Sequence, residues 1–90
     1  MRQLNETKIE NRYDARISCK YHTQEIINTT LDHARKIAFN NARAHNVDVK
    51  LQIRLAGRGN FRTFELFYPN GWVETYRTGE RAKYIIKSRS

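Results

Sequence analysis

Arginines surround a short glycine-bearing segment in the second half of this chain. Arg58 stands between Gly57 and Gly59, Arg54 precedes it by four residues, and Arg62 follows it by four. A guanidinium donates paired hydrogen bonds to phosphate oxygens, and glycine lets the backbone approach a phosphate closely. This chemistry needs no cofactor and no metal. We expect binding to nucleic-acid phosphates through Arg54, Arg58, Arg62, Arg77, Arg81 and Lys50.

The charge of the whole chain is strongly positive and unevenly distributed. Ninety residues carry 17 Lys and Arg against 9 Asp and Glu, for a formal net charge of +8. Residues 50–90 contain nine basic and three acidic side chains, so they account for +6 of this charge. A positive field on one side of a small domain attracts polyanions. The expected partner is therefore RNA, DNA or a nucleoprotein complex.

Aromatic side chains in the same half offer a second kind of surface. Alternation along the expected strands places Phe61, Phe67, Trp72 and Tyr76 on the outer face of a sheet, beside Lys50. Apolar patches on a sheet are typical of contacts with protein. The alternative function is therefore a modulator or inhibitor, of the kind that mobile elements encode. It would bind a protein partner, or a second copy of itself as a homodimer, through these four aromatics.

A metal-independent ribonuclease of the toxin type is the third function considered. Such enzymes surround a phosphate with basic and aromatic side chains. Suitable residue types are present at Arg62, Tyr68, Tyr76, Arg77 and Lys83. No spacing among them singles out a general acid and a general base. We therefore name no catalytic residue, and we expect binding rather than catalysis.

The histidines and the cysteine predict neither a metal site nor a reactive thiol. His33 and His45 are twelve residues apart, too far to share one metal site on a helix. Cys19 is the single cysteine and alternates with Ile17 and Tyr21, so we expect it in the core of a reduced, cytoplasmic protein. No apolar run is long enough to span a bilayer, and no membrane partner is expected.

The elements that must position these residues follow from hydrophobic periodicity. Residues 13–21 alternate as in a half-buried strand. A helix follows, capped at Thr23 or Thr29 and ending near Asn46, with a stripe made of Ile27, Leu31, Ala34, Ala38 and Ala42. Residues 47–55, 61–68 and 72–77 predict three antiparallel strands. Residues 78–90 fit a strand or, as we favour, a short helix.

The expected fold is a two-layer α+β sandwich in the order strand, helix, strand, strand, strand. A sheet of three to four antiparallel strands packs against one main helix, with a possible short C-terminal helix. Residues 1–12 are expected to form a flexible arm, and residues 13–90 a single domain. This topology directs the N-terminus of the helix toward the arginines, where its free N–H groups would attract an anion.

Turn chemistry predicts the register of the strands. Asn70-Gly71 is typical of a two-residue hairpin loop, which would pair Pro69 with Trp72. A four-residue loop at 57–60 would then pair Leu51 with Leu66. In this register the residues expected against the helix are Val49, Leu51, Ile53, Phe64, Leu66 and Val73.

Overall fold

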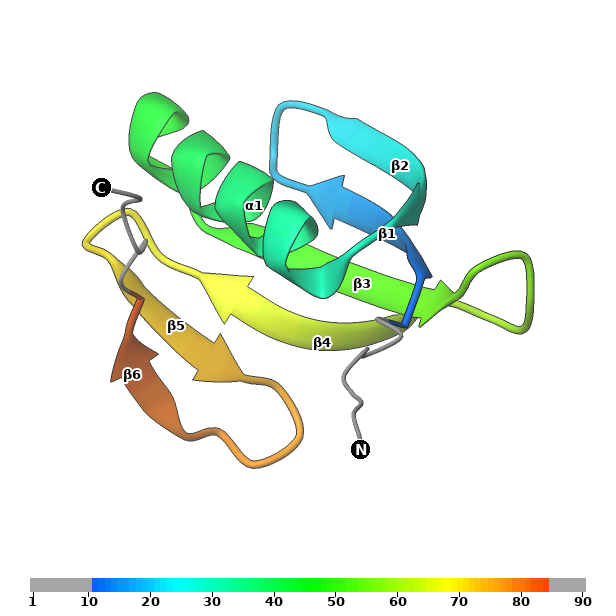
Figure 1. Cartoon of the computed structure of the whole chain (residues 1–90). Helices are drawn as coiled ribbons and strands as arrows, with labels where there is room; N and C mark the ends of the chain where they lie inside the picture. The colour runs from blue at the N-terminus through cyan, green and yellow to red at the C-terminus, as the bar shows by residue number, and fades with distance from the viewer. Residues whose placement is uncertain (1–10, 85–90) are drawn as a thin grey trace, which may run out of the picture.

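Six antiparallel strands and one helix make up the part of the chain that the computed structural model describes, residues 11–84 (Figure 1). In chain order they are β1 (Tyr13–Ser18), β2 (Thr23–Thr29), α1 (Leu31–His45), β3 (Val49–Leu55), β4 (Arg62–Phe67), β5 (Trp72–Thr75) and β6 (Arg81–Lys83). The order across the sheet is β2-β1-β3-β4-β5-β6. Residues 1–10 of the expected arm and 85–90 of the expected C-terminal helix lie outside the described residues.

The expected α+β class is right, but a sheet of three to four strands is wrong. β2 occupies residues where the sequence suggests the start of the helix. Its β-branched residues favour a strand, and it returns along β1 after a turn in which the Cys19 N–H donates to the His22 carbonyl at 2.9 Å. Ile27 matches the helical stripe only by spacing; it lies on this edge strand and is 62% exposed.

The helix therefore begins later than expected. Its N-cap is Thr30, whose hydroxyl accepts the backbone N–H of His33 at 3.2 Å. A side-chain oxygen at this position satisfies one of the N–H groups that a helix start leaves free. Neither Thr23 nor Thr29 is the cap, because both belong to β2.

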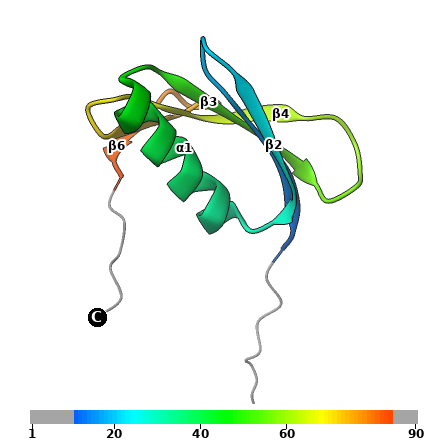
Figure 2. The same ribbon diagram turned by 90° about the horizontal axis from the view of Figure 1, so that it is seen from above.

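The end of the helix and its buried stripe confirm the prediction. Asn46 adopts a left-handed conformation with φ of 56°, and its N–H donates to the Ala42 carbonyl. Ala34, Ala38 and Ala42 are buried. These small side chains let α1 lie close to one face of the sheet (Figure 2). The helix packs mainly on β1 to β4, and it reaches the β5–β6 hairpin through side chains such as Phe39, whose ring lies 5.0 Å from that of Tyr84.

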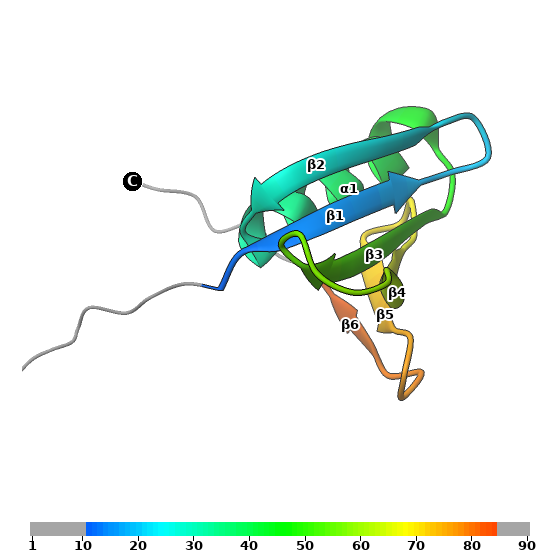
Figure 3. The ribbon, with the colours of Figure 1, turned by 90° about the vertical axis from the view of Figure 1, so that its right-hand side faces the viewer.

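The last strand replaces the short helix that we favoured. β6 pairs with β5, with Val73 opposite Ala82 and Glu74 opposite Arg81. The turn between them is closed by the Thr75 N–H, which donates to the Glu80 carbonyl at 2.8 Å. Figure 3 shows β5 and β6 turned away from the direction of β1 and β2. This divergence is the accumulated twist of the sheet.

The turn between β4 and β5 overturns the predicted register. The Tyr68 N–H donates to the Trp72 carbonyl at 2.9 Å, and the Gly71 N–H donates to the Tyr68 carbonyl at 3.0 Å. The loop thus contains three residues, with Gly71 at a φ of +95°. A two-residue loop of the predicted type needs a positive φ at Asn70 as well. Among the described non-glycine residues, only Asn28 and Asn46 have one.

The pairing of β4 with β3 is also shifted from the prediction, with an irregularity in the register between Leu51 and Gln52. Phe67 pairs with Val73 and is fully buried. Across β3, Leu51 pairs with Glu65 and Lys50 pairs with Leu66. The prediction that Leu51 and Leu66 share the helix face is therefore wrong, because a shift of one residue turns a strand over.

The observed core combines expected and unexpected residues. It consists of Ala15, Ile17, Ala34, Ala38, Ala42, Val49, Leu51, Phe67 and Val73. Val49, Leu51 and Val73 were predicted here, and Ile53 and Phe64 pack against this core while partly buried. Phe67 was predicted on the outer face. Its burial removes it from any binding surface.

An ion pair takes the place on β4 where the sequence predicted an apolar contact with the helix. Glu65 faces α1 and is 7% exposed. Arg35 of the helix donates to both of its oxygens, from Nε at 2.9 Å and from Nη2 at 2.8 Å. These bonds to Glu65 raise the pKa of Arg35. The pair fixes the helix over β4 with the forked geometry that arginine and carboxylate share.

Candidate nucleic-acid interface

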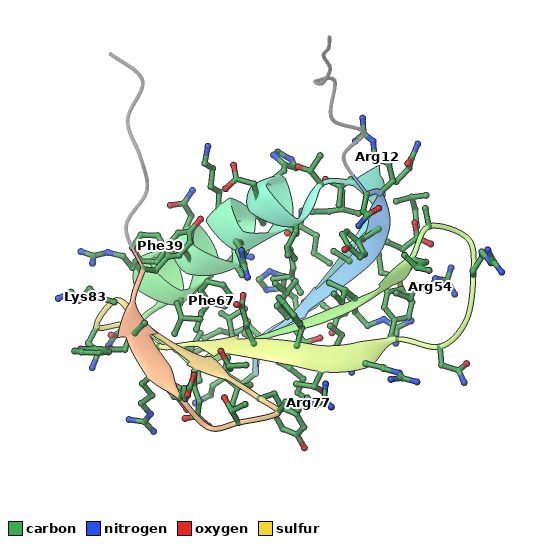
Figure 4. The ribbon with its side chains drawn as sticks, turned by 60° about the horizontal axis from the view of Figure 1, so that its bottom comes forward. Arg12, Phe39, Arg54, Phe67, Arg77 and Lys83 are labelled. Atoms are coloured by element: carbon green, nitrogen blue, oxygen red, sulfur yellow. The ribbon has the colours of Figure 1, made fainter. Side chains whose placement is uncertain are left out.

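A hollow of about 860 Å³ lies between the β3–β4 loop and the turn between β5 and β6. Its lining includes Arg54, Arg58, Arg62, Arg77, Tyr13 and Tyr76. We call it the arginine hollow. Four of the six residues predicted to bind nucleic acid thus come together. Figure 4 shows Arg54 beside the β3–β4 loop and Arg77 on the β5–β6 turn, with Lys83 at the opposite end of the sheet from Arg54.

Three of the four arginines leave their positive charge uncompensated. Within residues 11–84, Arg58, Arg62 and Arg77 form no ion pair. In the part of the chain that the structure describes, no aspartate or glutamate lines the hollow. Arg16, outside the hollow, contrasts with them, because Glu25 binds its guanidinium at 2.9 Å. Positive charge is thus concentrated where the surface is concave, which strengthens attraction for an anion.

The fourth arginine has a structural role. Arg54 donates from Nε to Asp14 Oδ2 at 2.9 Å and from Nη1 to the Gly59 carbonyl at 3.3 Å. Asp14 is 1% exposed, and it also accepts the backbone N–H groups of Gly57 and Asn28, each at 2.9 Å. The Gly57 and Asn28 bonds, followed by Arg54, lower the pKa of Asp14 against the opposing effect of its burial. The carboxylate therefore ties the glycine loop to β1 and β2.

Asp14 is the residue of this region that sequence reasoning missed. It lies opposite Arg54 in the pairing of β1 with β3. Another of its partners, Gly57, is 43 residues away in the chain. An acidic residue at a polar position of a strand looks like ordinary solvent-exposed surface. To predict its contacts with Arg54 and Gly57, one would have had to know that β1 pairs with β3.

The glycine loop holds Arg58 in a turn that needs glycine. Gly57 and Gly59 have φ values of 72° and 77°, a region that other residues rarely adopt. The Arg58 N–H donates to the Leu55 carbonyl at 2.9 Å, which closes the turn. Arg54 donates a hydrogen bond from Nη1 to the Gly59 carbonyl, which holds the other side of the loop. Arg58 is therefore presented at the tip of an anchored loop.

The opposite wall of the hollow comes from the end of β5. The Tyr76 N–H donates to the Phe64 carbonyl at 3.0 Å, which continues the pairing with β4 past the last strand residue. Tyr76 and Arg77 therefore lie beside the first half of β4, where Arg62 begins the strand. The predicted convergence of Arg77 with Arg58 and Arg62 is confirmed in this arrangement.

The other two residues predicted to bind nucleic acid lie elsewhere. Arg81 is on β6, where its Nε donates to Glu74 at 2.9 Å, and its guanidinium lies 4.9 Å from the centre of the Tyr68 ring. Lys50 is on β3, beside Leu66 and Ser18, at a smaller depression. Neither residue lines the arginine hollow. The helix N-terminus does not line it either.

The four aromatics predicted to bind a partner do not share one face. Phe67 is in the core. The Phe61 ring lies between two guanidiniums, 4.1 Å from Arg16 and 4.6 Å from Arg54. Trp72 is 40% exposed on β5, and Tyr76 belongs to the arginine hollow. The predicted aromatic docking face is therefore absent from residues 11–84.

The residues considered for ribonuclease chemistry are also separated. Arg62, Tyr76 and Arg77 line the hollow, whereas Tyr68 and Lys83 do not. The Tyr68 hydroxyl donates to Glu74 at 2.9 Å. Burial and this hydrogen bond raise the pKa of Tyr68. A raised pKa keeps the hydroxyl protonated, which does not suit a general base.

Two histidines and the cysteine gather at another end of the sheet. The rings of His22 and His45 are 5.5 Å apart, and Cys19 Sγ lies 3.7 Å from His22 Nδ1. Cys19 is half-buried and packs against the core, in line with its predicted place. Among residues 11–84, no group of three or more His, Cys, Asp or Glu side chains is arranged to hold a metal ion.

Comparisons with known proteins identified no relative of this chain. Among residues 11–84, no helix combines the length and hydrophobicity that a bilayer crossing needs. No protein-family model matches the chain, and neither a curated protein nor a solved structure matches it.

Proposed function

We propose that this protein binds nucleic acid through the arginine hollow, with Arg58, Arg62 and Arg77 on the phosphates. One observation carries the proposal: among residues 11–84, three arginines without a carboxylate partner line a concave surface to which no acidic residue contributes. Arg54 contributes by holding the loop rather than by binding the ligand. A cytoplasmic location, where a lone cysteine stays reduced and nucleic acid is abundant, is part of this proposal.

Phosphate binding has a quantitative signature in its dependence on salt. Each neutralised phosphate releases counterions, so it adds about 0.9 to the slope of log affinity against log salt for duplex DNA, and about 0.7 for a single strand. Arg58→Ala, Arg62→Ala and Arg77→Ala should each lower the slope by about this amount. Because all three side chains are exposed, the fold should remain intact.

The measurement is fluorescence anisotropy with labelled single-stranded and duplex DNA and RNA of equal length, between about 50 mM and 200 mM salt. Arg43→Ala is the matched control, because it removes the same charge from an exposed position near the end of α1. It should leave the slope close to that of the parent. If the Arg58/Arg62 double variant binds every probe with the affinity and slope of the parent, the proposal is wrong.

A further inference from the structure

Apolar surface is exposed inside the arginine hollow. Leu55 is 51% exposed and Tyr76 is 59% exposed, and both line the hollow. Ile53 and Phe64 are partly buried and contribute to the same lining. Phosphates make no use of such groups. An exposed leucine and an exposed tyrosine among arginines therefore indicate a ligand that has an apolar face as well as negative charge.

Duplex and single-stranded nucleic acids expose different chemical groups to this surface. In a duplex the base faces are stacked on one another, and only phosphates and sugars reach a concave protein surface. An unpaired nucleotide exposes the face of its base, which can stack on an aromatic ring while its phosphate binds arginine. A hollow of about 860 Å³ lies within the size range of pockets that enclose small ligands.

We propose that the arginine hollow binds an unpaired nucleotide of a single-stranded nucleic acid, with the base against Tyr76 and Leu55 and the flanking phosphates on Arg58, Arg62 and Arg77. This inference rests on the proposed function and names its ligand class. Tyr76 supplies the stacking surface, and Leu55 supplies apolar contact. Exposed polar groups of the lining, such as the Asn60 amide, are available to the base edge.

The position of Tyr76 supports this role. Its backbone is fixed by the hydrogen bond to the Phe64 carbonyl, and Arg77 follows it directly in the chain. Base contact and phosphate contact therefore come from consecutive residues on one wall. The anchored loop with Arg58 provides phosphate contacts from the other wall. A nucleotide between the walls would meet aromatic, apolar and cationic groups together.

The test uses two oligonucleotides of equal length and equal phosphate charge. One is oligothymidylate, and the other is the same backbone with abasic residues. The parent protein should bind the first about 5- to 160-fold more tightly, the range expected for stacking of one base. It should also bind the single strand more tightly than a duplex of the same length. Tyr76→Ala should remove the preference for bases and leave the salt slope unchanged, whereas Tyr76→Phe should retain the preference.

Tyr21→Ala is the matched control, because Tyr21 is 63% exposed and lies outside the hollow. It should bind both oligonucleotides as the parent does. If the parent binds intact and abasic strands equally, or if Tyr76→Ala keeps the full preference, the inference is wrong, although the arginine variants could still lower the salt slope. If no probe binds in a salt-dependent way, the proposed function itself fails.

Discussion

The burial of Phe67 in place of Leu66 allows a direct test of the register. Phe67 is fully buried, and its ring lies 5.8 Å from the ring of Tyr84 in an edge-to-face arrangement. Truncating a buried phenylalanine to alanine costs about 3–5 kcal/mol. A domain of this size has a total stability of about 5–13 kcal/mol. Phe67→Ala should therefore remove a large share of the free energy of unfolding.

Leu66, the residue before Phe67, provides the matched variant for comparison. It is only partly buried and lies on the outer side of the sheet, opposite Lys50 and Glu74. Leu66→Ala should cost about 1–2 kcal/mol, because less apolar surface is removed from contact. In the register predicted from the sequence, the two costs would be reversed. The pair of variants thus measures which residue of β4 faces the helix.

Urea unfolding followed by circular dichroism is the assay. With a urea m-value of about 1.5 kcal/mol/M, Phe67→Ala should lower the midpoint by about 2–3 M, and Leu66→Ala by about 1 M. If Phe67→Ala does not fold, Phe67→Leu should still fold, at a cost of about 1.5 kcal/mol. A larger loss for Leu66→Ala than for Phe67→Ala would refute the observed register.

Two further predictions concern Asp14 and Gly71. Because the pKa of Asp14 is lowered in the folded protein, its stabilising effect is fully present above its ordinary value of 3.8 and is lost as the pH falls through the lowered value. The melting temperature of Asp14→Asn should therefore vary less than that of the parent between about pH 5 and pH 2, and parallel curves would contradict this. Gly71→Ala should cost about 1–2 kcal/mol in urea unfolding, because alanine is strained at a φ of +95°. A Gly71→Ala variant as stable as the parent would contradict the three-residue loop.

Features that depend on neighbouring residues could be predicted from the sequence. The alanine stripe of α1 and the left-handed Asn46 are determined within one or two helical turns, and both are confirmed. The grouping of Arg58 with Arg62 follows from one hairpin. Arg77 joins them because the β4–β5 hairpin returns to the same end of the sheet. These parts of the candidate site needed only local patterns.

Features that depend on distant partners could not be predicted. Ile27 has helical spacing from Leu31, and only the pairing of β2 with β1 shows that it belongs to a strand. The choice between a two-residue and a three-residue loop rests on the conformation of Asn70, which propensity alone does not determine. The pairing of β4 with β3 also differs from the predicted register by one residue, and this places Phe67 in the core instead of on the surface.

Unequal anchoring gives the two walls of the hollow different mechanical properties. The wall with Arg58 is fastened through Asp14 to three strands. The wall with Tyr76 and Arg77 belongs to the β5–β6 hairpin, whose buried contacts come from Val73 and Tyr84, away from the hollow. A segment with few buried contacts opens at low free-energy cost. We therefore expect the wall with Tyr76 and Arg77 to move more readily than the wall with Arg58.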